Sequence, residues 1–164
     1  MESSVEIRSA REDDIPQMVL LSAARRVRYA QAQPVFWNFA PDADEKQSAW
    51  LKHLLTRETV RGLIAESGSE VLGFVLAQLV PSPPVYDPGG PTCSIDDYEV
   101  RDENSWPDVG RQLLDSALAW AREGGAAQAV VVCGHHDFPK REMLQAAGFP
   151  IASEWRVRPL KEPE

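Results

Sequence analysis

Apolar and polar residues follow two different periods along the 164-residue chain. A period of two, or a short apolar run between turn residues, is typical of a strand, whereas recurrence every three to four residues is typical of a helix with one apolar face. The first pattern predicts strands over 5–8, 61–66, 71–80, 92–100, 127–133 and 151–157. The second pattern predicts helices over 15–29, from 42 or 44 through 55, over 106–123 and over 138–147.

Turn and loop signals separate these elements. The segments 61–66 and 71–80 flank the turn Ser67-Gly68-Ser69-Glu70, which predicts a hairpin. The second of these strands is apolar on both faces, so we expect it in the centre of a sheet. The segment 33–41 contains three aromatic residues, and 81–91 contains five prolines and two glycines. Both segments predict irregular loops.

The resulting order of elements is βααββ, then βαβ, then αβ. A crossover helix between strands of an otherwise antiparallel set predicts an α/β fold of the α+β type. Its central sheet is expected to be mixed and mostly antiparallel, with helices on both faces. The length fits one domain over residues 1–164.

Charge and cysteine content narrow the function classes. The chain carries 17 basic and 25 acidic side chains, for a net charge of −8. Binding to nucleic acid or to an anionic membrane needs clustered cations, so we expect neither partner and leave amines open. Two cysteines are too few for a disulfide framework, and no apolar run predicts a signal peptide or a membrane helix. These observations predict a cytoplasmic protein.

The order of elements resembles the GNAT superfamily of acyl-CoA-dependent N-acetyltransferases, over about residues 5–160. The stretches that carry the resemblance are VEIRSAREDDIPQM at the first strand and helix, VLGFVLAQL at the third strand, IDDYEV followed by GRQLL at the core motif, and MLQAAGF at the final helix. The resemblance implies acetyl-CoA as co-substrate and direct transfer to a primary amine of a small molecule or peptide. It also implies a homodimer.

The core motif is where the resemblance places the cofactor. A helix N-terminus offers unpaired N–H groups and a positive dipole end to a pyrophosphate. In the family, the backbone at the positions of Tyr98, Glu99 and Val100 holds the pantetheine arm and the thioester. The cofactor-binding residues implied for this chain are Tyr98, Val100, Val109, Gly110, Arg111 and Gln112.

Three positions depart from the family pattern. Gly110 matches the last glycine of the motif, but Ser105 and Asp108 stand at the usual Gln or Arg and at the first glycine. Ser105-Trp106-Pro107-Asp108 fits a capping box, in which the helix caps its own N-terminus. The alternative is that Asp108 points to solvent and the backbone amides at the start of the helix remain free to bind phosphate. Leu144 stands at the position of the usual tyrosine acid and cannot donate a proton. Water or another side chain would replace it, the candidates being Tyr86, Tyr98, His135 and His136.

Acidic residues on the strand before the motif are candidates for proton transfer. On a regular strand, Asp97 and Glu99 share one face with Ile95, while Asp96 lies with Tyr98 and Val100 on the other. Asp97 and Glu99 could attract an ammonium group and relay its proton through water. The alternative is a solvated acidic strand end.

Two histidines follow the predicted strand over 127–133. His136 is a candidate base because imidazole titrates near neutral pH, although adjacent loop histidines are commonly just solvated. Cys133, His135, His136 and Asp137 are spaced too tightly to supply three ligands to one ion, so we expect no metal.

Phe36, Trp37 and Phe39 lie between the first two helices, where the family builds its acceptor pocket. With the nearby acids of 42–45 they suit an amine, although a hydrophobic plug or a dimer contact fits them equally. The leading hypothesis is an N-acetyltransferase. The alternative is a catalytically degenerate module that binds a ligand or a protein partner without acetyl transfer.

Overall fold

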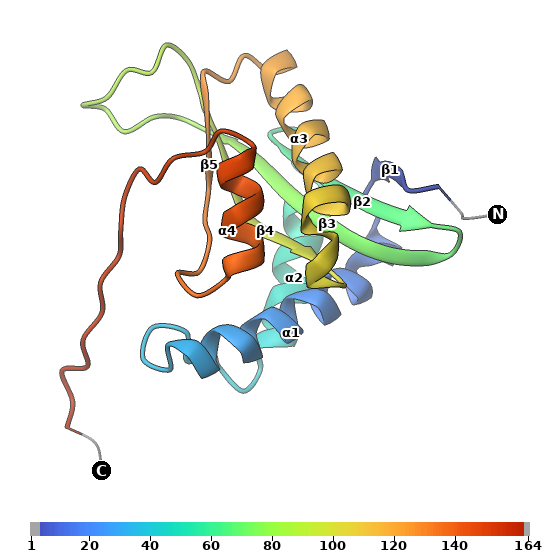
Figure 1. Cartoon of the computed structure of the whole chain (residues 1–164). Coiled ribbons are helices and arrows are strands. Elements are labelled where there is room, and N and C mark those ends of the chain that lie inside the picture. The colour runs from blue at the N-terminus through green and yellow to red at the C-terminus, as the bar shows by residue number, and fades with distance from the viewer. Residues whose placement is uncertain (1–3, 163–164) are drawn as a thin grey trace.

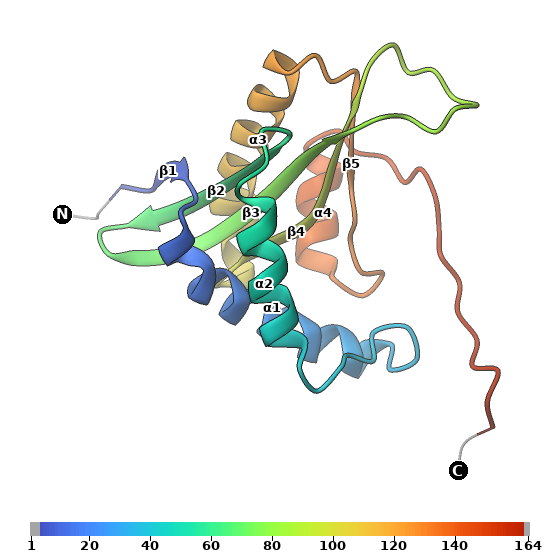
Figure 2. The same ribbon diagram turned by 180° about the vertical axis from the view of Figure 1, so that it is seen from behind.

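The computed structural model describes residues 4–162, and within them five strands form one sheet in the order β1-β2-β3-β4-β5 (Figures 1 and 2). The strands are β1 (Glu6–Ser9), β2 (Val60–Ser67), β3 (Glu70–Val80), β4 (Thr92–Val100) and β5 (Gln128–Val131). The α-helices are α1 (Ile15–Ala32), α2 (Ala43–Leu54), α3 (Arg111–Glu123) and α4 (Phe138–Ala146). Neighbouring strands run antiparallel except β4 and β5, which confirms the mixed sheet with β3 at its centre.

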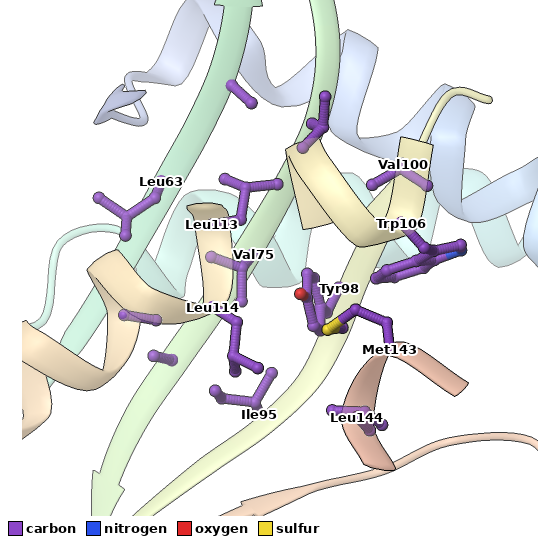
Figure 3. Packing of buried hydrophobic residues seen from close by; sticks show 14 of the residues in the cluster. Leu63, Val75, Ile95, Tyr98, Val100, Trp106, Leu113, Leu114, Met143 and Leu144 are labelled. Carbon is purple, nitrogen blue, oxygen red and sulfur yellow. The ribbon is translucent and has the colours of Figure 1, made fainter. Parts of the chain in front are cut away.

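Two helices cover each face of the sheet (Figures 1 and 2). Helices α1 and α2 pack on one face, where the buried side chains include Met18, Leu51, Leu54, Ile64, Phe74 and Leu76. Helices α3 and α4 pack on the other face, and Figure 3 shows Leu113, Leu114, Met143 and Leu144 meeting Val75, Ile95 and Tyr98 there. Each fully buried large apolar side chain contributes about 1.5–3 kcal/mol, so both layers are held by burial of the stripes that the periodicity predicts.

Strand β4 contains a bulge. Val75 lies opposite Tyr98 and Ala77 lies opposite Ile95, so two steps along β3 match three steps along β4. The extra residue falls at Asp96 and Asp97. A bulge reverses the alternation of side chains beyond it. The predicted separation of Ile95 from Tyr98 is therefore wrong, because both side chains lie in the core beneath α3 and α4.

The connection from β4 to α3 differs from the predicted capping box. A 3₁₀ turn over Glu103–Ser105 leads into a π-helical turn over Trp106–Gly110, and α3 continues from Arg111. The Ser105 hydroxyl donates to the carbonyl of Asp102 at 2.6 Å, and Asp108 accepts from the side chain of Gln112 at 2.8 Å. The capping-box prediction is therefore wrong, since both side chains find local partners elsewhere.

The predicted strand over 151–157 is also wrong. After α4, Gly148 turns the chain with a φ of +87°, and residues 149–162 run away from the sheet without pairing with any described strand (Figures 1 and 2). A strand requires a partner as well as an alternating sequence. Strand β5 is shorter and less buried than its apolar sequence indicates, because its outer edge is left open and Val130 is 43% exposed.

The remaining loops follow expectation. Residues 33–42 and 81–91 form no helix or strand of more than a turn, and the second loop projects beyond the sheet (Figure 1). None of the helices in residues 4–162 has the length and apolar character needed to cross a bilayer.

Candidate acyl-transfer site

A cavity of about 430 Å³ opens beside the bulge of β4. Helices α1 and α2 and the loop after α1 form its walls, and the residues that matter below are Tyr29, Phe36, Trp37, Asp96, Asp97 and Lys140. The ring of Trp37 contacts Tyr29 and Phe36 edge to face, with centroids 5.0 and 4.6 Å apart. The aromatic cluster that the sequence singled out therefore lines a cavity, with Phe36 and Phe39 each more than 40% exposed.

Two carboxylates of the bulge face this cavity in different states. Asp97 accepts from Arg25 at 2.9 Å and from Gln47 at 3.2 Å, so its charge is balanced. No hydrogen bond or ion pair within residues 4–162 reaches the carboxylate of Asp96. Partial enclosure by the cavity wall, together with the neighbouring charge of Asp97, raises the pKa of Asp96. The charges of Arg25 and Lys140 oppose this rise. A raised pKa makes an unpaired carboxylate a stronger base.

Glu99, the second carboxylate predicted for catalysis, is buried away from this cavity. It is 1% exposed, pairs with Arg28 at 3.0 Å and accepts from the backbone N–H of Val100 at 3.0 Å. Burial raises the pKa of Glu99, while the charges of Lys140 and Arg28 oppose that rise. Glu99 lines a second cavity of about 410 Å³ with Arg28, Arg101 and Asn104, at the loop that leads to α3.

The edge of β4 beyond Ile95 is closed by side chains. Strand β5 pairs with β4 only from Thr92 to Ile95, after which the two strands separate. The carbonyl of Tyr98 accepts from the Nζ atom of Lys140 at 2.9 Å, and the N–H of Val100 is held by Glu99. Two of the backbone groups at the positions that the resemblance assigns to the pantetheine arm, the Tyr98 carbonyl and the Val100 N–H, are therefore bonded within the chain.

Lys140 itself is 1% exposed, although it comes from the first turn of α4. Its Nζ atom lies 4.9 Å from the ring centroid of Tyr98 and 5.3 Å from that of Trp106. Burial and the positive charge of Arg25 lower the pKa of Lys140. A lysine with a lowered pKa carries more of the neutral, nucleophilic amine at neutral pH than a solvated lysine does.

The residues at the start of α3 are placed close together but are largely engaged. Gly110 is buried, accepts from the Tyr98 hydroxyl and lies against the ring of Trp106, where a Cβ atom would collide. The backbone N–H of Arg111 bonds within the helix. The Arg111 side chain pairs with Asp115 at 3.0 Å, while Val109 is 4% exposed. Close packing against Trp106 therefore explains why position 110 is a glycine. Close approach of a phosphate would explain it equally well.

Two proton-donor positions are resolved by the structure. Leu144 is 7% exposed and packs in the core beside Met143, so its side chain lines neither cavity (Figure 3). Tyr29, from α1, donates its hydroxyl to Asp137 at 2.5 Å and accepts from the N–H of Gly134 at 3.2 Å. Burial and the charge of Asp137 raise the pKa of Tyr29, so the phenol stays protonated.

His136 is not brought to the carboxylates. Its exposed ring lies 5.2 Å from that of His135 and 6.4 Å from that of Phe138, and it lines neither cavity. Among residues 4–162, no three His, Cys, Asp or Glu side chains converge in a group that could hold a metal ion.

Sequence reasoning missed Asp96, Lys140 and Tyr29 as residues of the site. Lys140 had a signal, because it occupies a position of the apolar stripe of α4, three and four residues before Met143 and Leu144. No sequence signal pointed to Asp96, because its carboxylate is unpaired only since Arg25 pairs with the neighbouring Asp97.

Comparison with known proteins identifies a family and several similar folds. The Acetyltransferase (GNAT) family matches residues 24–149. The fold is similar to that of a predicted acetyltransferase with acetyl-CoA from Clostridium acetobutylicum, at 18% identity, a TM-score of 0.74 and coverage of 96% of this chain and 97% of that chain. It is also similar to the aminoglycoside N-acetyltransferase AAC(6')-Iy in complex with CoA, at 17% identity, a TM-score of 0.72 and coverage of 99% and 97%.

A third similar structure is the aminoglycoside 6'-N-acetyltransferase AAC(6')-Ih from Acinetobacter baumannii, at 15% identity, a TM-score of 0.71 and coverage of 98% and 99%. At these identities the likeness concerns the fold. No curated protein sequence shows a significant match to the chain.

Proposed function

Since the chain belongs to the Acetyltransferase (GNAT) family, we propose that it transfers an acetyl group from acetyl-CoA to a primary amine held in the 430 Å³ cavity. The observation that carries the proposal is the unpaired carboxylate of Asp96 at the bulge of β4. It lies where an aromatic wall and an acidic floor meet.

The cavity has the features that recognise an ammonium group. Aromatic faces attract cations by about 0.5–2 kcal/mol, and Phe36 and Trp37 provide such faces. Asp96 supplies a negative charge that no side chain of residues 4–162 neutralises by direct pairing. The aminoglycoside acetyltransferases of similar fold act on small molecules with amino groups, which supports a small-molecule amine as acceptor. A peptide amine fits the same chemistry.

In the proposed reaction Asp96 takes a proton from the bound ammonium, which frees the nitrogen lone pair. The amine nitrogen then attacks the thioester carbon, a C–N bond forms, and the C–S bond breaks with its electron pair on sulfur. The thiolate takes a proton from water, because Leu144 offers none. Asp97 stays paired with Arg25, and its part is to hold the bulge and add negative charge to the floor.

Acetyl-CoA is proposed to lie along the outer edge of β4 and over the loop to α3. The candidate contacts remain Tyr98, Val100, Val109, Gly110, Arg111 and Gln112. The second cavity adds Arg28, Arg101 and Asn104, whose donors suit phosphate oxygens, while the carboxylates of Glu99, Asp102 and Glu103 line the same cavity and oppose an anion. For the arm to pair with β4, Lys140 and Glu99 must release the backbone groups that they now hold.

A second candidate function follows from that last requirement. A module that binds a partner or ligand without acetyl transfer is favoured by the contact of Lys140 with Tyr98, since this contact occupies the edge that a cofactor would use. The position of Leu144 in the core supports the same alternative.

Ligand binding and thiol release separate the two candidates. Thermal unfolding would be followed with CoA and with acetyl-CoA, because a ligand at 100 times its Kd adds about 2.7 kcal/mol of stability. We expect both ligands to raise the Tm and a panel of amines to cause release of free thiol. No shift at millimolar ligand rules out the acetyltransferase. A shift without thiol release from any amine supports the binding module.

We also propose that the protein is a homodimer in which residues 151–161 of each chain pair with the open edge of β5 in the other. Residues 151–157 of this segment alternate in the manner of a strand, yet Ile151 and Trp155 are 72% and 82% exposed, and the following Leu160 is 88% exposed. Trp155 contacts Phe36 with ring centroids 5.8 Å apart, and the segment does not pair with its own β5. If residues 151–161 of each chain pair with β5 of the other, the open edge of β5 in each copy gains a partner through one symmetric interface.

A further inference from the structure

Lys140 differs from the other lysines of the chain. Lys46 and Lys52 have side chains that are 68% and 65% exposed, and Lys161 is exposed as well. Lys140 is 1% exposed, and no carboxylate within residues 4–162 forms an ion pair with it. It nevertheless reaches the first cavity, whose lining includes both Lys140 and Lys46.

Burial without an ion pair disfavours the charged form of the Lys140 amine, while two aromatic faces, the Cys133 thiol and the carboxylates of Glu99 and Asp137 act in the opposite direction. The Nζ atom donates to the carbonyl of Tyr98 and lies near two aromatic rings, those of Tyr98 and Trp106. Arg25 contributes a positive charge nearby. An amine without a counter-ion in a desolvated site releases its proton more readily than one in water. Lys140 therefore presents a nucleophile at the point where β4 loses its partner strand.

We propose that Lys140 is an acylation site, whose amine takes the acyl group of a thioester bound along β4. The proposal rests on the proposed function to the extent that acetyl-CoA reaches this edge. The ammonium first loses a proton to water through the cavity. The amine then attacks the thioester carbon, the N–C bond forms and the C–S bond breaks with its electron pair on sulfur. The second proton passes to the thiolate, which gives acetyl-lysine and free CoA.

The product suits its surroundings better than the reactant does. Acetyl-lysine keeps one N–H, so it can still donate to the carbonyl of Tyr98. It loses the buried charge, which is costly without a counter-ion. Once formed, the amide does not pass the acetyl group on. Acylation of Lys140 is thus a single-turnover modification that is distinct from catalytic transfer to a free amine.

The test uses the full chain with acetyl-CoA and maps acetyl groups by mass spectrometry after proteolysis, at several pH values. Each unit by which the pKa is lowered gives about tenfold more neutral amine at neutral pH. We expect Lys140 to be acetylated faster than Lys46, the matched lysine of the same cavity, with a rate that levels off at a lower pH. Excess CoA should suppress acetylation of Lys140 but not of Lys46. A rate for Lys140 no greater than that for Lys46, or an unmodified Lys140, overturns the proposal.

Amine acetylation measured in the same samples separates this inference from the proposed function. Modified Lys140 without acetylation of any added amine supports the acylation site and contradicts the enzyme. Acetylated amines with unmodified Lys140 support the enzyme and overturn the acylation site. Both measurements are made on the unsubstituted protein, so they do not depend on whether a Lys140→Arg variant folds. Where that variant folds, it should lose the acetyl group at position 140 alone.

Discussion

The Nζ atom of Lys140 lies 2.9 Å from the carbonyl oxygen of Tyr98, on the first stretch of β4 that β5 does not cover. Parallel strands that separate leave a row of backbone groups without partners, and such an edge invites an extended ligand or another strand. In this protein a lysine from α4 and the side chain of Glu99 close the edge instead. Access of a cofactor to β4 therefore depends on two side chains of the chain itself.

Lys140→Ala should strengthen binding of CoA. The substitution removes the side chain that occupies the edge and leaves the Tyr98 carbonyl free to accept from an amide of the ligand. One net hydrogen bond is about 1 kcal/mol, so we expect Kd to fall between a few-fold and roughly tenfold in a calorimetric titration. Lys46→Ala changes an exposed lysine of the same cavity and should leave Kd within about twofold. Weaker binding by Lys140→Ala would show that Lys140 contacts the cofactor favourably.

Asp96→Asn should lower the rate of amine acetylation. General-base assistance contributes about 10²–10⁴-fold, and the amide of asparagine cannot accept the proton. Because the pKa of Asp96 is raised, the unsubstituted protein should lose activity as pH falls through that pKa, and this acidic limb should be absent from the residual activity of the variant. Asp13→Asn, at an exposed acid outside both cavities, is the control. An unchanged kcat/KM for Asp96→Asn would assign the base elsewhere.

The periodicity of the sequence predicts the helices and the antiparallel core well, because each of these elements buries a stripe that it carries itself. It fails where structure depends on a distant partner. The bulge that places Ile95 and Tyr98 on one face is a property of the pairing with β3, and no residue of β4 alone encodes it. The alternation of 151–157 is present, but within the described chain this segment pairs with no strand, although the outer edge of β5 is open.

The candidate site divides in the same way. Asp97 and the aromatic cluster could be located from residue type and order, and both line the cavity. The pairing of Asp97 with Arg25 could not be predicted, because 72 residues of sequence separate the two residues. This ion pair makes Asp96 the free carboxylate. The burial of Glu99 and the position of His136 outside both cavities could not be predicted either, since residue type alone fixes neither.

Gly110→Ala should destabilise the fold. A Cβ atom at this position would collide with the ring of Trp106, which is 1% exposed and has little room to move. Overpacking of this kind costs about 1–3 kcal/mol in the free energy of unfolding, which urea denaturation can measure. The same substitution in a Trp106→Leu background should cost less, because the smaller side chain yields. Equal costs in the two backgrounds would contradict the packing role of Gly110.

Asp14 should make stability depend on pH in the acid range. The Arg8 guanidinium donates to both oxygens of Asp14 at 2.8 Å, and the N–H of Arg11 donates at 2.7 Å. These contacts, chiefly those with Arg8, lower the pKa of Asp14. The resulting stability is present above the unfolded pKa of about 3.9 and is lost as pH falls through the folded pKa.

Asp14→Asn should therefore lower the free energy of unfolding by about 1.5–3 kcal/mol at neutral pH. In the variant, this free energy should decrease less steeply as the pH is lowered into the acid range. Asp13→Asn, at the exposed neighbouring residue, should do neither. Matching acid profiles of the Asp14→Asn variant and the unsubstituted protein would show that Asp14 is not the group responsible.

The segment 151–161 should control the oligomeric state. Its exposed apolar residues and the open edge of β5 are complementary, and two chains related by a twofold axis can satisfy both edges at once. We expect the mass of a dimer by light scattering at micromolar concentration. Trp155→Asp should shift the mass toward the monomer, because a charge would enter the paired segment. Tyr86→Asp places the same charge on a residue of the proline-rich loop that is 71% exposed, and should leave the mass unchanged. A monomeric mass for the unsubstituted protein, or a dimer that withstands removal of residues 151–164, would refute strand exchange.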